Sequence, residues 1–265
     1  MKTIFITGST DGIGKLTAIK LAKDNHEVIL HGRNSEKLQT TIDEVKAISK
    51  NENIKGFVAD FSSFESLLSM TEKIKQEVSK IDVLINNAGV FNSKNTFAEN
   101  GFEIRFMVNY FAPFLLTKKL LPIINNSEEP RIINLSSAAQ APLDFDALKG
   151  NKELITQNAY AQSKLALTMW SFYLANQYES INTIAVNPGS LLNTKMVQEA
   201  FGQFWSSADK GANILYDLAI SEKHANSSGK YFDNDKGIFA NAHPDAYKQN
   251  KIDRLIETTN ALLNF

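Results

Sequence analysis

Thr7-Gly8-Ser9-Thr10-Asp11-Gly12-Ile13-Gly14 follows a short apolar segment and precedes an amphipathic stretch that begins at Lys15. Glycine has no Cβ atom, so a glycine-rich turn can bend tightly and can approach a phosphate group closely. The N–H groups at the start of the following helix lack partners within that helix and attract negative charge. The segment therefore predicts a strand, a turn and a helix that bind a dinucleotide, although an ordinary glycine-rich turn has the same composition.

Short β-branched segments alternate with longer amphipathic segments along the rest of the chain. Each longer segment has room for a helix that crosses the sheet, which predicts parallel strands covered on both faces. We predict a single Rossmann-type α/β domain over residues 1–265, with a doubly wound parallel sheet of about seven strands and helices on both faces. Strands are expected at 3–6, 27–30, 54–59, 83–85, 131–135 and 182–186, helices at 35–48 and 62–78, and loops at 140–158 and after 223.

The composition excludes several classes of function. The formal net charge is -1 with both signs scattered along the chain, so no basic stripe suits a nucleic acid. No apolar run approaches the roughly 18 residues of a membrane span. These features predict a cytoplasmic enzyme that has no membrane or nucleic-acid partner. The chain has no cysteine, and its histidines form no pair at helical spacing, so we expect no metal site. We expect the four histidines to be surface or structural residues, and these are His26, His31, His224 and His243.

Tyr160 and Lys164 are four residues apart and would share one face of a helix. An adjacent ammonium stabilises a phenolate, which brings the pKa of the phenol nearer to neutral pH and suits it to general acid–base catalysis. Such pairs also arise by chance, and Tyr247 and Lys251 form a second one. Only the first pair lies between a strand that ends in two serines and a strand that ends in Asn187-Pro188-Gly189, so it is the stronger candidate.

The spacing of the glycines, TGxxxGxG, resembles that of the short-chain dehydrogenase/reductase family. The resemblance covers residues 1 to about 232 and implies one nucleotide-binding domain, in which the later half of the same sheet forms the substrate site. The other motifs of the family occur in the same order as Asp60, Asn86-Asn87-Ala88-Gly89, Asn109, Ser136-Ser137, Tyr160-Ala161-Gln162-Ser163-Lys164 and Asn187-Pro188-Gly189.

Four catalytic side chains are implied by the resemblance. Tyr160 would be the general acid or base, and Lys164 would hold the nicotinamide ribose and lower the pKa of Tyr160. Ser137 would orient the substrate carbonyl and stabilise charge on its oxygen, whereas Ser136 would be structural. Asn109 would hold a water that links the lysine to solvent. A serine after a strand is also a common turn residue, and a polar residue in a kinked core helix would equally account for Asn109.

Pro113 bears on the position of this water. Proline has no N–H, and the carbonyl four residues earlier belongs to Asn109. We therefore expect that carbonyl to be free and to bind an ordered water that leads toward Lys164.

The segment after the second strand bears on the choice of cofactor. An NAD-selective site usually has an acid there, which accepts from the adenosine ribose hydroxyls and repels a 2′-phosphate. This chain has His31-Gly32-Arg33-Asn34 instead. Arg33 could bind the 2′-phosphate, with neutral hydrogen bonds from Asn34 and Ser9, so NADP(H) is predicted in preference to NAD(H). A solvated arginine at the start of a helix is the alternative.

The resemblance to the short-chain dehydrogenase/reductase family also implies a cofactor cleft that is lined by small residues. Asp60 would lie over the adenine, although a carboxylate there is also an ordinary cap for a helix that starts at Phe61 or Ser62. Thr194 would contact the carboxamide of the nicotinamide. The cofactor-binding residues predicted in this way are Gly8, Ser9, Asp11, Gly12, Ile13, Gly14, Arg33, Asn34, Asp60, Phe61, Asn87, Ala88, Gly89, Tyr160, Lys164, Pro188, Gly189 and Thr194.

Two loops are expected to bound the substrate, at about 138–158 and 190–210. The interval from Ser137 to Tyr160 is about ten residues longer than is usual in the family, and this extra length resembles the retinol-dehydrogenase-like branch, as do segments 31–34 and 228–232. Retinoid chemistry does not follow from that likeness. The second loop contains an aromatic cluster of Phe201, Phe204 and Trp205. We expect this cluster to pack in the core, because such clusters belong to the core more often than to a pocket.

The sequence thus predicts an NADP(H)-dependent oxidoreductase that moves hydride between the nicotinamide and a small carbonyl or alcohol substrate. An NAD-dependent alcohol dehydrogenase of the same fold and a cofactor-binding regulator without catalysis are the alternatives. A homo-oligomer is expected to form, if at all, through helices within 101–124 and 160–178.

Overall fold

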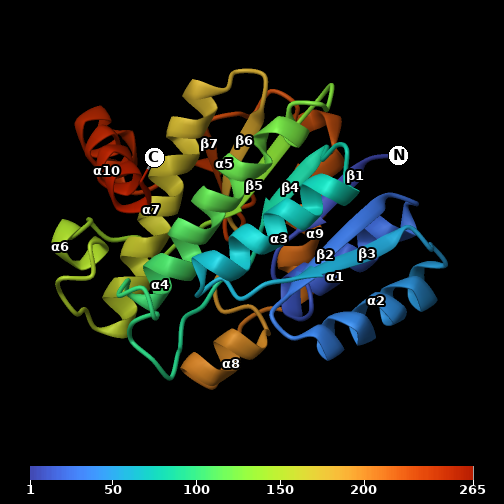
Figure 1. Ribbon diagram of the computed structural model, residues 1–265, viewed down its shortest axis with the longest axis horizontal. Coiled ribbons are helices and arrows are strands. Elements are labelled where there is room, and N and C mark those ends of the chain that lie inside the picture. Colours follow the sequence, from blue (N-terminus) through green and yellow to red (C-terminus); the bar gives the residue numbers. More distant parts are fainter. Residues whose placement is uncertain (265) are drawn as a thin grey trace.

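The computed structural model describes residues 1–264 and contains one eight-stranded sheet (Figure 1). Phe265, the last residue of the predicted domain, lies outside the described residues. The strands are β1 (Thr3–Ile6), β2 (Glu27–Gly32), β3 (Ile54–Val58), β4 (Val83–Asn86), β5 (Arg131–Leu135), β6 (Asn182–Asn187), β7 (Lys230–Asp233) and β8 (Ile238–Ala240). Their order is β3-β2-β1-β4-β5-β6-β7-β8, so the direction of winding reverses between β1 and β4. Ligands of such sheets bind at the carboxyl ends of the strands near this reversal.

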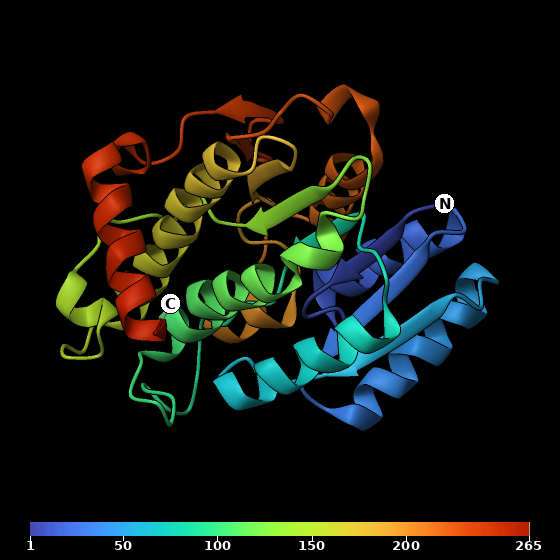
Figure 2. The ribbon, with the colours of Figure 1, turned by 45° about the horizontal axis from the view of Figure 1, so that its top comes forward.

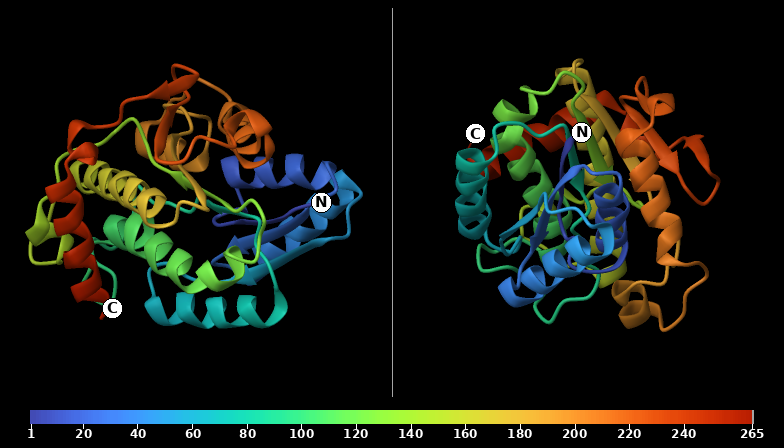
Figure 3. Two further views of the ribbon diagram at one scale, coloured as in Figure 1. Left: turned by 90° about the horizontal axis from the view of Figure 1, so that it is seen from above. Right: turned by 90° about the vertical axis from the view of Figure 1, so that its right-hand side faces the viewer.

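Helices cover both faces of the sheet (Figures 2 and 3). Helices α1, α2 and α9 pack on one face, and α3, α5 and α7 pack on the other. The helical segments are α1 (Gly12–Lys23), α2 (Ser35–Ser49), α3 (Phe64–Glu77), α4 (Ile104–Phe106), the π-helical η1 (Met107–Phe111), α5 (Ala112–Ile124), α6 (Phe145–Leu148), α7 (Thr156–Gln177), α8 (Lys195–Phe201), α9 (Ala208–Ile220), the 3-10 helices η2 (Glu222–His224) and η3 (Pro244–Tyr247), and α10 (Gln249–Leu263).

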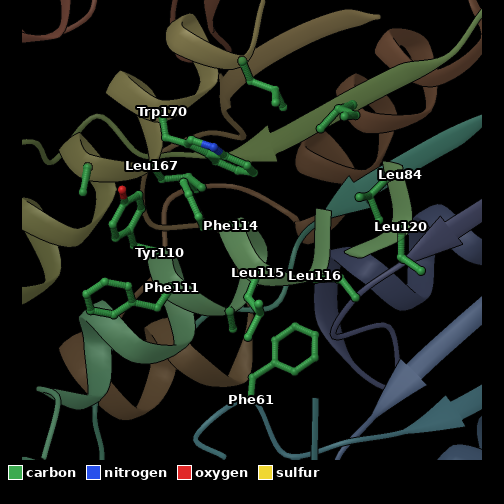
Figure 4. Close-up of a cluster of buried hydrophobic side chains, with 14 of the residues drawn as sticks. Phe61, Leu84, Tyr110, Phe111, Phe114, Leu115, Leu116, Leu120, Leu167 and Trp170 are labelled. Carbon is green, nitrogen blue, oxygen red and sulfur yellow. The ribbon is translucent and has the colours of Figure 1, made fainter. Parts of the chain in front are cut away.

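The core is divided by the sheet into two apolar layers. Every residue of β1, β4 and β5 is buried, as expected for parallel strands covered on both faces. Figure 4 shows the layer beneath α5 and α7, where Phe114 lies beside Leu167 and Trp170. These two helices are therefore fixed tightly against the strands whose carboxyl ends carry the candidate site.

The predicted doubly wound parallel sheet is confirmed, and each strand named from the sequence matches an observed strand to within two residues. Seven strands are parallel, and the eighth, β8, pairs antiparallel with β7. The expectation of loops after residue 223 is wrong, because that region contains β7, β8 and α10. Helix α10 buries only Ile252, Leu255, Ile256 and Thr259, a narrow stripe in an otherwise polar segment.

Segment 140–158 also differs from a plain loop. It contains the short helix α6, which begins where the Asp144 carboxylate accepts hydrogen bonds from the N–H groups of Asp146 and Ala147. Helix α10 lies alongside α7 (Figure 2), and the Arg254 guanidinium lies 4.0 Å from the ring centroid of Phe145. The C-terminal helix therefore fixes the long segment that precedes Tyr160.

Within residues 1–264, no helix has the length and apolar character that crossing a membrane requires. The same residues contain no group of three or more histidine, cysteine, aspartate or glutamate side chains that could hold a metal ion.

Candidate active site

The glycine-rich turn after β1 packs against the turn after β4. Gly8 has a φ of +62°, and a Cβ atom added to it would lie 2.7 Å from the Cα atom of Ala88. A Cβ atom at Gly14 would lie 2.5 Å from the Asn87 side-chain nitrogen. Neither position has room for a larger residue. The two turns can approach each other at the reversal of the sheet because both consist of small residues.

Thr7 and Asn87 hold these turns together. The Thr7 hydroxyl oxygen accepts hydrogen bonds from the N–H groups of Asn87 and Ala88, both at 3.0 Å. The Asn87 Nδ2 atom donates to the carbonyls of Thr7 and Gly8, at 2.7 and 2.9 Å. Asn87 therefore shapes the cleft through the backbone of the glycine turn. Thr7 was not among the predicted site residues, because its role depends on a partner 80 residues away.

His31 fixes the same turn from the side of β2. Its Nδ1 atom accepts from the N–H of Gly8 at 3.0 Å, so Nε2 carries the proton and donates to the carbonyl of Ala59 at 3.1 Å. The imidazole stacks on Phe61 with ring centroids 4.2 Å apart. Burial lowers the pKa of His31 to about 4, which keeps the ring neutral and able to accept. His31 is thus a structural residue, in agreement with the prediction that it is a surface or structural histidine.

Ser9 does not have the role predicted for it. Its side chain is fully buried, its hydroxyl oxygen accepts from the N–H of His31 at 2.9 Å, and its O–H donates to the carbonyl of Ile6 at 2.9 Å. A hydroxyl engaged in this way cannot reach a 2′-phosphate. The prediction of a neutral hydrogen bond from Ser9 to the cofactor phosphate is therefore wrong.

The start of α1 has the properties that a phosphate site requires. Asp11 accepts from the N–H of Gly12 at 2.8 Å, whereas no described group accepts from the N–H of Ile13 or Gly14. The Asp11 carboxylate is paired with Lys37 at 2.6 Å, which offsets its negative charge and lowers its pKa. Open N–H donors on and beside glycines, which have no side chain of their own, fit the pyrophosphate of a dinucleotide.

Arg33, Asn34 and Asp60 lie exposed after β2 and β3. The Asn34 side-chain oxygen caps α2 by accepting from the N–H of Lys37 at 2.8 Å, which leaves only its amide N–H groups for a ligand. Asp60 accepts from the N–H of Ser62 at 2.8 Å, but it is not a helix cap, since α3 begins at Phe64 and its cap is Ser63. The predicted start of this helix at Ser62 is therefore two residues early.

Lys164 lies one helical turn after Tyr160 on α7, and its side chain is buried. Its Nζ atom donates to the carbonyl of Leu135, the last residue of β5, at 2.7 Å and lies 5.6 Å from the centroid of the Tyr160 ring. Burial lowers the pKa of Lys164 to about 7. The lysine is therefore only partly charged at neutral pH in this arrangement.

Tyr160 is half-buried beneath Phe91, with ring centroids 4.9 Å apart. Burial raises the pKa of Tyr160, and interaction with the Ser137 side chain opposes this effect to a smaller extent. The expectation that Lys164 lowers the pKa of Tyr160 is not met in this arrangement. The reason is geometric, because the ammonium is directed at the Leu135 carbonyl rather than at the phenol oxygen.

The two serines after β5 have different environments. Ser136 is buried and shares a 2.6 Å hydrogen bond with the Thr168 hydroxyl, which is the structural position expected for it. Ser137 is partly exposed, and its hydroxyl oxygen accepts from the N–H of Ala139 at 3.1 Å. Its carbonyl accepts from the Tyr231 O–H at 3.0 Å. The main chain of Ser137 is therefore held, and its side chain interacts with Tyr160.

Asn109 lies in the π-helical segment and connects three elements. Its Nδ2 atom donates to the Val90 carbonyl and to the Ser163 hydroxyl, both at 3.0 Å, and its Oδ1 atom accepts from the Val90 N–H at 2.8 Å. A Cβ atom at Gly89 would lie 3.3 Å from Asn109 Oδ1 and 3.5 Å from Lys164 Nζ. Asn109 and Lys164 therefore converge on the backbone of Gly89.

Pro113 follows this segment and accounts for its shape. The N–H of Ala112 donates to the carbonyl of Met107, five residues earlier, so the helix is widened rather than simply kinked. Single π-helical turns of this kind often mark functional sites. The free Asn109 carbonyl and its bridging water remain a prediction.

The turn after β6 is held by the turn between β7 and β8. Asn187 is buried, and its Nδ2 atom donates to the carboxylates of Asp233 and Asp235, at 3.0 and 2.9 Å. Gly189 has a φ of +122°, which suits glycine. Thr194 caps α8 by accepting from the N–H of Val197, and its methyl group faces Gly12. Thr194 therefore lies beside the glycine turn, as its predicted role requires.

The aromatic cluster of Phe201, Phe204 and Trp205, at the end of α8 (Lys195–Phe201) and just after it, is not part of the core, contrary to expectation. This seven-residue helix buries no side chain, and Trp205, just beyond it, is 72% exposed. Phe201 packs on Phe91 with ring centroids 5.2 Å apart, so Phe91 lies between α8 and Tyr160. Figure 1 shows α8 beside the loop that precedes α4. Phe201 is thus connected to Tyr160 through Phe91.

Comparison with known proteins agrees with this geometry. The sequence model described as "short chain dehydrogenase" matches residues 2–203. The chain belongs to the short-chain dehydrogenase family. Retinol dehydrogenase 13 of Mus musculus is 35% identical over 251 residues, which cover 88% of this chain and 75% of the relative. Polyprenol dehydrogenase of Homo sapiens is 30% identical and covers 89% of this chain and 77% of its own length.

Solved structures of this short-chain dehydrogenase fold are also similar. A protein from Mycobacterium paratuberculosis superposes with a TM-score of 0.80 at 23% identity, covering 100% of this chain and 94% of its own. A short chain dehydrogenase from Shigella flexneri 2a, complexed with NADP, has a TM-score of 0.71 at 25% identity, covering 88% and 97%. Together with the sequence relatives, this likeness identifies the chain as an oxidoreductase in the retinol-dehydrogenase-like branch of the short-chain dehydrogenase family.

Proposed function

We propose that this short-chain dehydrogenase is an NADP(H)-dependent oxidoreductase that interconverts a small carbonyl compound and its alcohol, with Tyr160 as general acid or base. The proposal rests on one observation above all. Tyr160, Lys164, Ser137 and Asn109 converge at the carboxyl ends of β4 and β5, beside a glycine turn that fits a pyrophosphate.

NADPH, when bound, supplies the hydride that reduces the carbonyl carbon. Tyr160 then gives its proton to the carbonyl oxygen, and Ser137 orients that oxygen by donating a hydrogen bond. Lys164 holds the nicotinamide ribose, and Asn109 holds the Val90 and Ser163 groups that border it. Since burial raises the pKa of Tyr160, the phenol is protonated at neutral pH, which suits the reductive direction.

A panel of ketones, aldehydes, quinones and alcohols tests this proposal, with nicotinamide absorbance as the readout and both cofactors supplied. We expect at least one carbonyl compound to be reduced with NADPH. A protein that binds NADPH but turns over no compound would favour the cofactor-binding regulator. Faster turnover of alcohols with NAD would favour the NAD-dependent alcohol dehydrogenase.

Preference for NADP(H) is supported by the segment after β2, which has no acid and exposes Arg33. Charge-assisted hydrogen bonds contribute roughly 1.5 to 3 kcal/mol, so Arg33→Ala is expected to weaken NADPH binding by about 10-fold to 100-fold. Binding of NADH should change little, because NADH has no 2′-phosphate. Dissociation constants for both cofactors at fixed salt measure the effect.

Lys73→Ala is the matched control, since it removes one exposed positive charge from α3 on the other face of the sheet. It should leave both constants unchanged. Tighter binding of NADH than of NADPH by the parent protein would overturn the preference, as would equal weakening of both cofactors by Arg33→Ala.

A further inference from the structure

Glu103 and Arg105 form a buried ion pair at the start of α4. Glu103 is 0% exposed and Arg105 is 4% exposed, and the Arg105 Nη1 atom donates to Glu103 Oε1. The second oxygen, Oε2, accepts from the N–H groups of Arg105 and Phe106, at 2.7 and 3.2 Å. Both oxygens of the carboxylate are thus used within one helical turn.

The two remaining donor groups of Arg105 reach out of this turn. Its Nε atom donates to the carbonyl of Phe91 at 2.8 Å, and its Nη2 atom donates to the Thr156 hydroxyl at 3.1 Å. Thr156 is the first residue of α7 and lies one turn before Tyr160. The Phe91 ring packs on Tyr160. Arg105 therefore connects the two elements that enclose the phenol.

Asn109, one turn further along, makes the same kind of connection. It holds the main chain of Val90 and reaches Ser163 on α7, just as Arg105 holds the main chain of Phe91 and reaches Thr156. Two successive residues of the loop after β4 are thus tied to α7 by two side chains one helical turn apart.

A second buried arginine shows that such a residue can be purely structural. Arg131 is 2% exposed, and its Nη1 atom donates to the carbonyls of Leu218 and Ser221, at 3.1 and 2.8 Å, at the end of α9. Burying an arginine side chain is costly unless its hydrogen bonds are satisfied. The bonds of Arg131 secure a helix end, whereas those of Arg105 end beside Tyr160.

We propose that Arg105, neutralised by Glu103, is a positioning residue that holds the Phe91 ring against Tyr160 and so controls the access of water to the phenol. The role in turnover rests on the proposed function, but the position of Phe91 does not. Phe91 also packs on Phe201 of α8, so the ion pair that holds Phe91 also positions this helix.

Fluorine NMR of protein labelled with fluorotyrosine tests this proposal without any substrate. The Tyr160 resonance is assigned by its loss in Tyr160→Phe, and its titration is followed in the parent, Arg105→Lys, Phe91→Ala and Arg131→Lys. Lysine keeps the charge beside Glu103, but its donors are all on one nitrogen, whereas Arg105 reaches its three partners through three separate nitrogens. We expect Arg105→Lys and Phe91→Ala to titrate at a pH roughly one unit lower than the parent, because water reaches the phenol. Arg131→Lys should titrate with the parent.

Thr156→Val, which removes only one bond of Arg105, is the milder variant if Arg105→Lys fails to fold, and it should shift the titration in the same direction. The proposal is overturned if the Arg105 and Thr156 variants shift the resonance no more than Arg131→Lys does, or if Phe91→Ala leaves it unchanged. If the resonance shifts as expected in a protein that reduces no carbonyl compound, the proposed function fails and the positioning role stands.

Discussion

Tyr160→Phe is expected to lose about 100-fold to 10,000-fold in kcat while the protein keeps its fold and its affinity for NADPH. The substitution removes only the phenol oxygen, and the ring that packs on Phe91 remains. Proton transfer to the substrate oxygen then depends on water, to which the half-buried site gives limited access. Turnover of the best carbonyl substrate and the dissociation constant of NADPH, measured together, separate loss of chemistry from loss of binding.

Tyr247→Phe is the matched control. Tyr247 also precedes a lysine by four residues, but it is 51% exposed, and that lysine, Lys251, pairs with Asp245. The Tyr247 oxygen only accepts from the N–H of Ala242 at 2.9 Å. This variant should retain parental turnover. The assignment of Tyr160 would be untenable if both variants and the parent had equal activity.

The contrast between these two tyrosines shows what local sequence can predict. Their YxxxK spacing is identical, and only the order of strands around Tyr160 distinguished it. The strands were predictable because parallel strands buried on both faces consist of short β-branched runs, as in β5. Helix α10 was missed because its few buried residues are spread among polar ones, and its stability depends on packing against α7.

Features of the site that depend on distant partners were not predictable. Ser9 looked available for a phosphate, yet the backbone of His31 uses its hydroxyl. Asp235 lies outside every motif, yet its carboxylate holds the turn after β6 through Asn187 and Ser190. In each case the decisive contact joins residues more than twenty positions apart, and local patterns carry no information about it.

The pKa values of Tyr160 and Lys164 illustrate the same limit more strongly. Spacing along a helix indicated that the two groups are neighbours, and this is correct. It did not indicate how deeply they are buried or that the Lys164 ammonium is directed at the Leu135 carbonyl. Burial therefore raises the pKa of Tyr160 where the sequence suggested a lowered value.

Burial of Lys164 leads to a second large effect, on stability. The pKa of Lys164 is lowered from 10.5 to about 7 by burial, so between these values the unfolded chain binds the proton more tightly than the folded protein does. The free energy of unfolding should therefore rise with pH across this window, by about 1.4 kcal/mol for each pH unit. Below pH 7 Lys164 is protonated in both the folded and the unfolded protein, and the burial of its charged ammonium lowers the free energy of unfolding by the full amount.

Lys164→Met removes this titration, and urea unfolding at several pH values between 7 and 10 measures the difference. The pH dependence should be flatter in the variant than in the parent, whereas Lys73→Met, on the exposed surface of α3, should keep the parental slope. The slope is the decisive quantity, because the variant also leaves the Leu135 carbonyl without its donor, a loss of about 1 kcal/mol that does not depend on pH. The same variant should lose carbonyl reduction, so the lysine lowers stability at neutral pH in return for function. Parallel slopes in the parent and Lys164→Met would show that this lysine does not titrate near pH 7.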